Sequence, residues 1–353
     1  MSTSEILTID PLITKFFLVF NLLVCAETVG LFGIIGNIFN IWNFFKQGLN
    51  NSVTVTLALL GVSEIGALVA LQGYNVVSMP WMSVGSGVID PFALRLIFFY
   101  LNGYFIRVSG LITAYATFER CVSVFWPFKA KLILTRNMAV IVNISIYFLL
   151  LMYILPIFYV VQFKYDFSPQ FNKTVFSFSL RRNAGEFSLM AYVVIIMTDI
   201  AIPYLIFLIN IICTSFIIRH LKTKVKWRKC VTHSFNRKLK KHKMKKEKRV
   251  MVMLVTLSVV FVVCLLPHCV VLTAFILQYN NGDKVSVTYS FTFLLETINC
   301  SVSCIIYYKM SSKYREVAKK MLGAFKKFNF ICNNVSTIAR KGSKKPGKDP
   351  SGG

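Results

Sequence analysis

The chain has 353 residues, of which 56% are hydrophobic, 14% are aromatic and only 15% are charged. Soluble domains carry charge on about a quarter of their residues, so this composition excludes a soluble globular protein and indicates a membrane protein. The formal net charge of +26 gathers in loops between apolar segments, where anionic lipid of the inner leaflet is a nearer partner than nucleic acid.

Seven apolar runs follow one another along the chain, each of about 20 residues or more and long enough to cross a hydrocarbon core about 30 Å thick. The sequence therefore predicts an all-α membrane protein, a seven-transmembrane helix bundle with a short amphipathic cytoplasmic helix after the seventh span. The spans are expected near residues 18–45, 53–78, 92–125, 137–161, 187–218, 249–278 and 285–308.

Charge gives this bundle a direction in the plasma membrane. Lysines and arginines are concentrated in the loops after the first, third and fifth spans and in the tail, so the positive-inside rule places the N-terminus outside and the C-terminus inside. The predicted parts are an extracellular N-terminus at 1–17, the bundle at 18–310, an amphipathic surface helix at 311–330 and a disordered basic cytoplasmic tail at 331–353.

Glu64 lies near the middle of the second span. An ionised carboxylate there is costly unless it is paired, protonated or hydrated. It is therefore a candidate for function, with a structural hydrogen-bonding role as the alternative.

The third span ends in Glu119-Arg120-Cys121, where an apolar helix meets a basic loop. An acid followed at once by an arginine at a membrane face predicts a charged side chain that becomes available only when a conformational switch occurs. We expect Arg120 to be restrained at rest by Glu119 and by Glu247, which lies at the foot of the sixth span. The alternative for Glu247 is a solvated residue within a lysine run.

Two modification sites are predicted. Of the N-x-S/T sequons in the chain, Asn172-Lys173-Thr174 alone falls on the predicted outer side, so Asn172 is the candidate for glycosylation. Cys332, just past the amphipathic helix, could be palmitoylated, with an unmodified thiol as the alternative. The nine cysteines lie in spans or on the cytoplasmic side, so no disulfide is expected.

The sixth span contains Pro267, which removes an internal hydrogen bond and favours a kink. A kinked helix can swing its lower end outward. His268 beside it, like the three histidines of the basic loop, has no metal or nucleophile partner at useful spacing. The sequence thus predicts no enzyme, no metal site and no cofactor.

Taken together and in order, several motifs resemble those of rhodopsin-like (class A) G-protein-coupled receptors over nearly the whole chain except the tail. These motifs are Gly36-Asn37, Glu119-Arg120-Cys121, Pro203, Phe261 with Cys264 and Pro267, and Tyr307. The resemblance implies a receptor that binds an extracellular small-molecule or peptide ligand in the bundle and activates a heterotrimeric G protein. It assigns Phe261, Pro267 and Tyr307 to the switch with Arg120.

A narrower resemblance, carried by Lys46-Gln47-Gly48 and by Tyr307-Tyr308-Lys309-Met310, is to invertebrate chemosensory receptors, molluscan ones especially. A neuropeptide or amine receptor of the same fold is the alternative. An ion-conducting or transport protein is a more distant rival, because buried charges also line ion paths, but the chain shows no internal repeat of the kind transporters have.

The family register also implies sites. Arg107 and Asp199 should face one another, either as a structural ion pair or, with Glu296 and His268, as the binding site for a charged small molecule such as an amino acid, an amine or a peptide terminus. A polar pocket similar to the family's sodium site is implied at Asn37, Glu64, Asn299 and Ser303. Both cysteines of the family's outer disulfide are missing, which leaves the order of the outer loop open.

Overall fold

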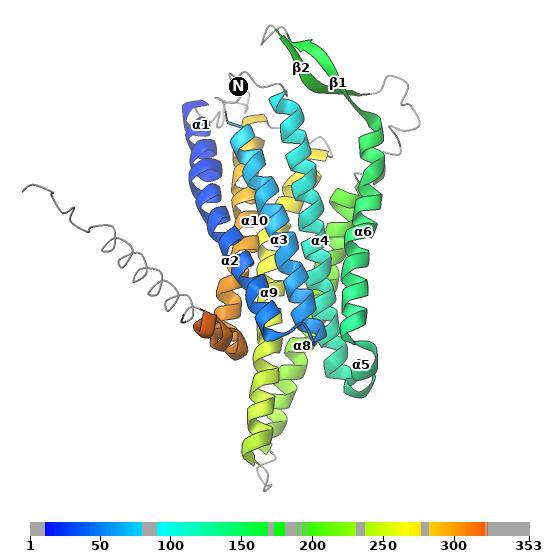
Figure 1. Cartoon of the computed structure of the whole chain (residues 1–353), viewed down its shortest axis with the longest axis vertical. Helices are drawn as coiled ribbons and strands as arrows, with labels where there is room; N and C mark the ends of the chain where they lie inside the picture. The colour runs from blue at the N-terminus through cyan, green and yellow to red at the C-terminus, as the bar shows by residue number, and fades with distance from the viewer. Residues whose placement is uncertain are drawn as a thin grey trace, which may run out of the picture.

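The computed structural model describes residues 11–79, 90–168, 173–180, 189, 193–194, 196–230, 237–276, 282–321 and 323. Long helices stand side by side in these residues, with a small hairpin at one end of the bundle (Figure 1). The elements are α1 (Pro11–Val19), η1 (Phe20–Ala26), α2 (Glu27–Gln47), α3 (Ser52–Val77), α4 (Pro91–Phe125), α5 (Pro127–Ile133), α6 (Arg136–Val160), β1 (Val161–Ser168), β2 (Lys173–Leu180), η3 (Ile196–Ala201), α8 (Ile202–Cys230), α9 (Arg237–Ile276) and α10 (Gly282–Met310).

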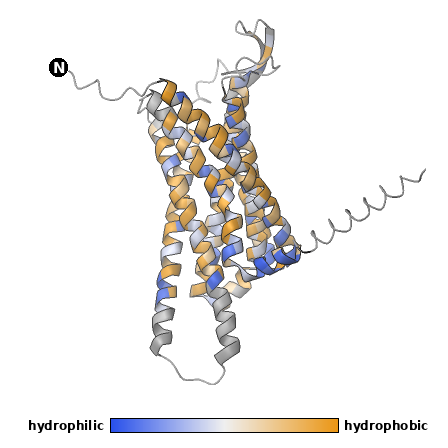
Figure 2. Ribbon diagram, turned by 90° about the vertical axis from the view of Figure 1, so that its left-hand side faces the viewer, coloured by the Kyte–Doolittle hydropathy of each residue, from blue (hydrophilic) through white to orange (hydrophobic). Residues whose placement is uncertain are grey.

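The apolar helices account for the predicted spans. Six are long and apolar enough to cross a membrane, and the described apolar part of α6, Arg136–Met152, is shorter. The whole of α6 has 25 residues, or about 37 Å at 1.5 Å per residue, which is enough to span. Hydrophobic residues cover the rods along most of their length (Figure 2). The predicted seven-helix bundle is confirmed, and a short helix at residues 312–321 follows α10.

Several helices extend beyond their apolar runs. The first rod begins at Pro11, where α1, η1 and α2 follow without a break, rather than at residue 18. The fifth rod continues to Cys230, and the sixth begins at Arg237 rather than at residue 249. Lysine and arginine are good helix formers, so a charged segment can continue a helix that apolar residues start. Hydrophobicity marks the membrane part of each helix and not its end.

An antiparallel hairpin between α6 and η3 is an addition that the sequence analysis did not predict. β1 pairs with β2 from Val161 opposite Leu180 to Ser168 opposite Lys173. Apolar residues alternate with polar ones along β1, in the order Val161, Phe163, Tyr165 and Phe167. That period of two is the pattern of a strand with one apolar face.

The core of the bundle forms around α4, the predicted third span. Val108 and Ile112 of this helix are fully buried and pack in one cluster with Leu57 of α3, Leu254 of α9 and Tyr307 of α10. The helix begins at Pro91, and the carboxylate of Asp90 accepts a hydrogen bond from the backbone N–H of Phe92 at 3.0 Å. Proline in the first turn and aspartate at the N-cap are favourable starts.

Candidate functional site

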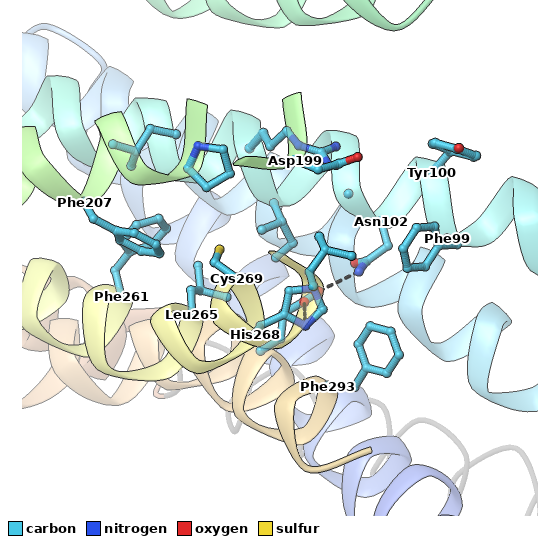
Figure 3. Close-up of a pocket in the computed structure, with 17 residues that line it drawn as sticks. Phe99, Tyr100, Asn102, Asp199, Phe207, Phe261, Leu265, His268, Cys269 and Phe293 are labelled. Atoms are coloured by element: carbon cyan, nitrogen blue, oxygen red, sulfur yellow. Dashed lines mark hydrogen bonds and ion pairs between the residues drawn. The ribbon is translucent and has the colours of Figure 1, made fainter. Parts of the chain in front are cut away.

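A small pocket, here called the charged pocket, lies between α4, η3, α8, α9 and α10 (Figure 3). All four residues predicted to bind ligand line it, namely Arg107, Asp199, His268 and Glu296. Its apolar wall contains the aromatic rings of Phe99, Phe207, Phe261 and Phe293. Its free volume of about 50 Å³ holds about four water-sized groups.

Arg107 and Asp199 form an ion pair across the pocket wall. The Nε–H of Arg107 also donates to the carbonyl oxygen of Thr198 at 2.8 Å. Both acceptors belong to η3, a π-helical turn, and such turns often occur at functional sites. The two side chains face one another, as the family register implies. Their role in ligand binding stays a prediction.

Glu296 of α10 also lines the charged pocket and is 1% exposed. It accepts a hydrogen bond from the amide Nδ2 of Asn102 at 2.6 Å, and its Oε2 lies 3.8 Å from Nδ1 of His268. The sequence analysis missed Asn102. The sequence feature that could have identified Asn102 is that it is the only amide side chain in this apolar helix and lies five residues before Arg107.

The hydroxyl of Thr292 joins His268 to the backbone of α10. It lies 2.9 Å from the carbonyl oxygen of Tyr289 and 3.2 Å from Nδ1 of His268. The imidazole is thereby held beside Glu296 on the pocket wall.

Three of the four residues predicted for the polar pocket come together in the middle of the bundle. The hydroxyl of Ser303 lies 3.0 Å from Oδ1 of Asn37 and 2.9 Å from the carboxylate of Glu64. Asn40, one turn below Asn37, donates to the same amide oxygen at 2.9 Å. Asn299 is also buried, and its side chain contacts the thiol of Cys300.

A much wider space, here called the basic crevice, opens at the other end of the bundle. It has a volume of about 860 Å³ and is lined by Arg120, Arg249 and Lys313 together with Glu119 and Tyr307. Glu119 is 2% exposed and accepts a hydrogen bond from the hydroxyl of Ser52 in α3.

Glu247 lies in α9, but its side chain is outside the part of the structure that is described. The expected restraint of Arg120 by Glu247 therefore stays a prediction.

Phe261 of α9 packs against two neighbouring helices at the charged pocket. The ring of Phe261 lines the pocket and packs on Phe207 of α8, with ring centroids 5.8 Å apart. It also lies against Gly110 of α4, where an added Cβ would come within 2.8 Å of the ring. Pro267 lies inside the same helix at the level of the pocket, between Leu265 and His268.

A buried polar triad lies closer to the crevice and was not predicted. The hydroxyl of Thr117 in α4 lies 2.8 Å from that of Ser258 in α9. Both contact the amide oxygen of Asn210 in α8, at 3.2 and 2.8 Å. Three helices are thus joined one turn from Arg120. The sequence offered only isolated polar residues in three separate spans.

The hairpin is tied to the top of α4 without a disulfide. The backbone N–H of Asp90 donates to the carbonyl of Phe176 at 2.8 Å, and the hydroxyl of Ser177 donates to the carboxylate of Asp90 at 2.8 Å. Since the same carboxylate caps α4, one residue links the strand to the helix. The thiols of the cysteines within the described residues are free.

Two predicted modification sites, Asn172 and Cys332, lie outside the described residues. Glycosylation at the first and palmitoylation at the second stay predictions.

The comparisons with known proteins agree with this architecture. Among curated proteins, none matches the chain. The sequence model of a family described as 7 transmembrane receptor (rhodopsin family) matches residues 36–307, which is well over half of the chain. The match includes the whole lining of the charged pocket and most of the lining of the basic crevice. Members of this family are multi-pass membrane receptors that signal rather than catalyse. The chain therefore belongs to the rhodopsin family of seven-transmembrane receptors.

Proposed function

We propose that this receptor binds an extracellular small molecule in the charged pocket, activates a heterotrimeric G protein through the basic crevice, and serves in chemosensation. The observation that carries the proposal is that α9 lines both spaces. It contributes Phe261 and His268 to the pocket and Arg249 to the crevice. A ligand that moves this helix changes both ends of the bundle.

The mechanism is a shift between two populations of the receptor. At rest, Glu119 and Glu247 restrain Arg120; in the active state, α9 bends at Pro267, its lower end moves outward and Arg120 meets the G protein. Ligand needs only to bind the open state more tightly than the closed one. The contact of Phe261 with Gly110 supports this lever, because a rigid ring against a glycine transmits displacement from α9 to α4.

The orientation that we propose follows the charge of the loops. The pocket end and residues 1–17 face outside, and the crevice end, the helix after α10 and the basic tail face anionic lipid of the inner leaflet. Lys313, which lines the crevice and donates to the carbonyl of Gln47 at 3.1 Å, supports placing that helix at the membrane surface.

The small free volume of the charged pocket favours a small molecule over a peptide. An amine receptor of the nervous system is therefore the second candidate. Finding the transcript in sensory epithelium supports a chemosensory role, and finding it in central neurons supports the alternative.

The decisive experiment for function is a ligand screen with a G-protein nucleotide-exchange readout, run in parallel on wild type and on a charge-exchanged variant, Arg107→Asp with Asp199→Arg. We expect the variant to reach the cell surface but to lose the response. Recovery of both expression and response would make the pair structural only. No exchange by wild type with any screened ligand would contradict the coupling.

A further inference from the structure

The charged pocket does not have balanced charge. Its lining contains one guanidinium, Arg107, and two carboxylates, Asp199 and Glu296. Arg107 and Asp199 neutralise one another in an ion pair. Arg107 also donates a hydrogen bond from Nε–H to the backbone carbonyl of Thr198. Glu296 is left as the surplus acid. Of the other polar groups on the wall, Tyr100, Asn102 and Cys269 carry no formal charge in their ordinary forms, and His268 is not an acid.

The groups around Glu296 offer acceptors to a ligand. Oδ1 of Asn102 is buried and has no hydrogen-bond partner among the described residues, while its amide nitrogen is used by Glu296. Nδ1 of His268 lies 3.8 Å from Oε2 of Glu296, so the imidazole borders the same position. A buried acceptor without a donor is costly. Two carboxylates beside a single guanidinium leave one negative charge in excess, which is costly inside the membrane as well.

We infer that the charged pocket selects a small organic ammonium ion, bound by Glu296 and Asn102 with His268 at its side. An ammonium group is a compact cation with up to three N–H donors and no acceptor, which matches the unused groups in both charge and hydrogen-bonding sense. The aromatic rings of Phe99 and Phe293 flank this position and attract cations to their faces. The inference rests on the proposed function for its link to signalling, but the binding can be measured alone.

Anions and large ligands fit poorly. A carboxylate ligand would have to displace Asp199 from Arg107 and would then lie in the same small cavity as Glu296. The free volume of about 50 Å³ accepts about four water-sized groups, so the part of the ligand inside the pocket is the ammonium and a short carbon chain.

The test uses the full chain, purified in lipid nanodiscs, and measures thermal stabilisation by four probes at neutral pH. Butylamine supplies the cation, butyrate and 1-butanol place a carboxylate and a hydroxyl on similar carbon chains, and glycine is the small zwitterion. We expect butylamine to stabilise the receptor, because a ligand that binds only the folded state raises its stability by mass action. The other three should give markedly weaker binding.

Variants locate the site. Glu296→Gln keeps the shape but removes the charge, and should weaken butylamine about 10- to 100-fold, the range expected for a charged hydrogen bond. Glu296→Asp keeps the charge and should lose less. Glu27→Gln is the matched control, because Glu27 is another carboxylate within a span but contacts Asn75 of α3 at 3.2 Å, outside the pocket. It should leave the affinity unchanged.

Tighter binding of butyrate than of butylamine, no stabilisation by butylamine, or full affinity in Glu296→Gln would each overturn the inference. The comparison of probes on wild type holds even if a variant fails to fold. Binding of butylamine without any increase in G-protein nucleotide exchange would support the ligand class and contradict the proposed signalling, so the two claims can fail separately.

Discussion

The charged pocket and the basic crevice lie in one bundle but are built in opposite ways. The pocket is small, about 50 Å³, and its one guanidinium, that of Arg107, is already paired with Asp199. The crevice is wide, about 860 Å³, and three bases line it. The first geometry suits a ligand of a few atoms, and the second suits a macromolecular surface. Under the proposed function, ligand recognition and G-protein coupling would be separated along the same helices.

Two tyrosines that line the crevice differ in whether their hydroxyl groups are hydrogen-bonded. The hydroxyl of Tyr314 donates to Oδ1 of Asn40 at 2.6 Å. The hydroxyl of Tyr307 is buried and has no hydrogen-bond partner within the described part of the chain, although its ring packs on Phe44 and Tyr314. Tyr314 therefore fastens the helix after α10, whereas Tyr307 lies in a position that hydrogen bonding does not fix.

The largest expected effect is on output at the crevice. Arg120→Ala removes the central charge and should lower G-protein nucleotide exchange at least about tenfold, the loss expected from one charged hydrogen bond or more, while ligand affinity in the pocket falls less. The control is Lys309→Ala, an exposed base at the same end of the bundle. Equal exchange by Arg120→Ala and wild type would remove the crevice from the account.

The next effect is on stability at the pocket. Asp199→Ala leaves Arg107 buried without its counter-charge and should lower the free energy of unfolding by about 3–5 kcal/mol. Thermal unfolding of the purified receptor measures this, with Glu316→Ala as the exposed-carboxylate control. If Asp199→Ala were as stable as wild type, the pair would not hold η3 against α4.

A smaller effect is expected at the hairpin. Asp90→Ala removes the acceptor for Ser177 and the cap of α4, and should destabilise this junction by about 1.5–3 kcal/mol, as for hydrogen bonds to a charged group. Amide hydrogen exchange in β2 should become faster while exchange in α3 stays the same. Asp90→Asn, which keeps one acceptor oxygen, should lie between. Unchanged exchange in β2 would mean that the pairing of β1 and β2 alone holds the hairpin.

The smallest effect distinguishes the two tyrosines. Tyr314→Phe should cost about 1 kcal/mol, because it removes a hydrogen bond and leaves Asn40 without its donor. Tyr307→Phe should cost nothing, since its hydroxyl has no partner to lose among the described residues. Thermal unfolding of both variants gives the comparison. A greater loss in Tyr307→Phe than in Tyr314→Phe would reverse the roles assigned here.

The starts of the membrane helices could be predicted from the sequence where a turn or capping residue comes just before an apolar run. The second, third and fourth spans were expected to start at 53, 92 and 137, and the structure begins them at Ser52, Pro91 and Arg136. The extension of α9 back to Arg237 could not be read from hydrophobicity, because charged residues continue a helix without adding to the apolar signal.

The site was harder to predict than the fold. Family register brought Arg107 opposite Asp199, but nothing in the chain alone shows how the helices rotate about their axes. For that reason Asn102 and the triad of Thr117, Asn210 and Ser258 were missed. A polar residue in a membrane helix requires a hydrogen-bond partner, but only the packing of the helices shows which residue that partner is.

The claim that the two ends are coupled is tested most directly by reciprocal binding. The affinity for butylamine is measured in lipid nanodiscs with and without a nucleotide-free heterotrimeric G protein. Coupling between two sites acts equally in both directions, so the G protein should tighten the amine about 5- to 150-fold. The same affinity with and without the G protein would contradict the account.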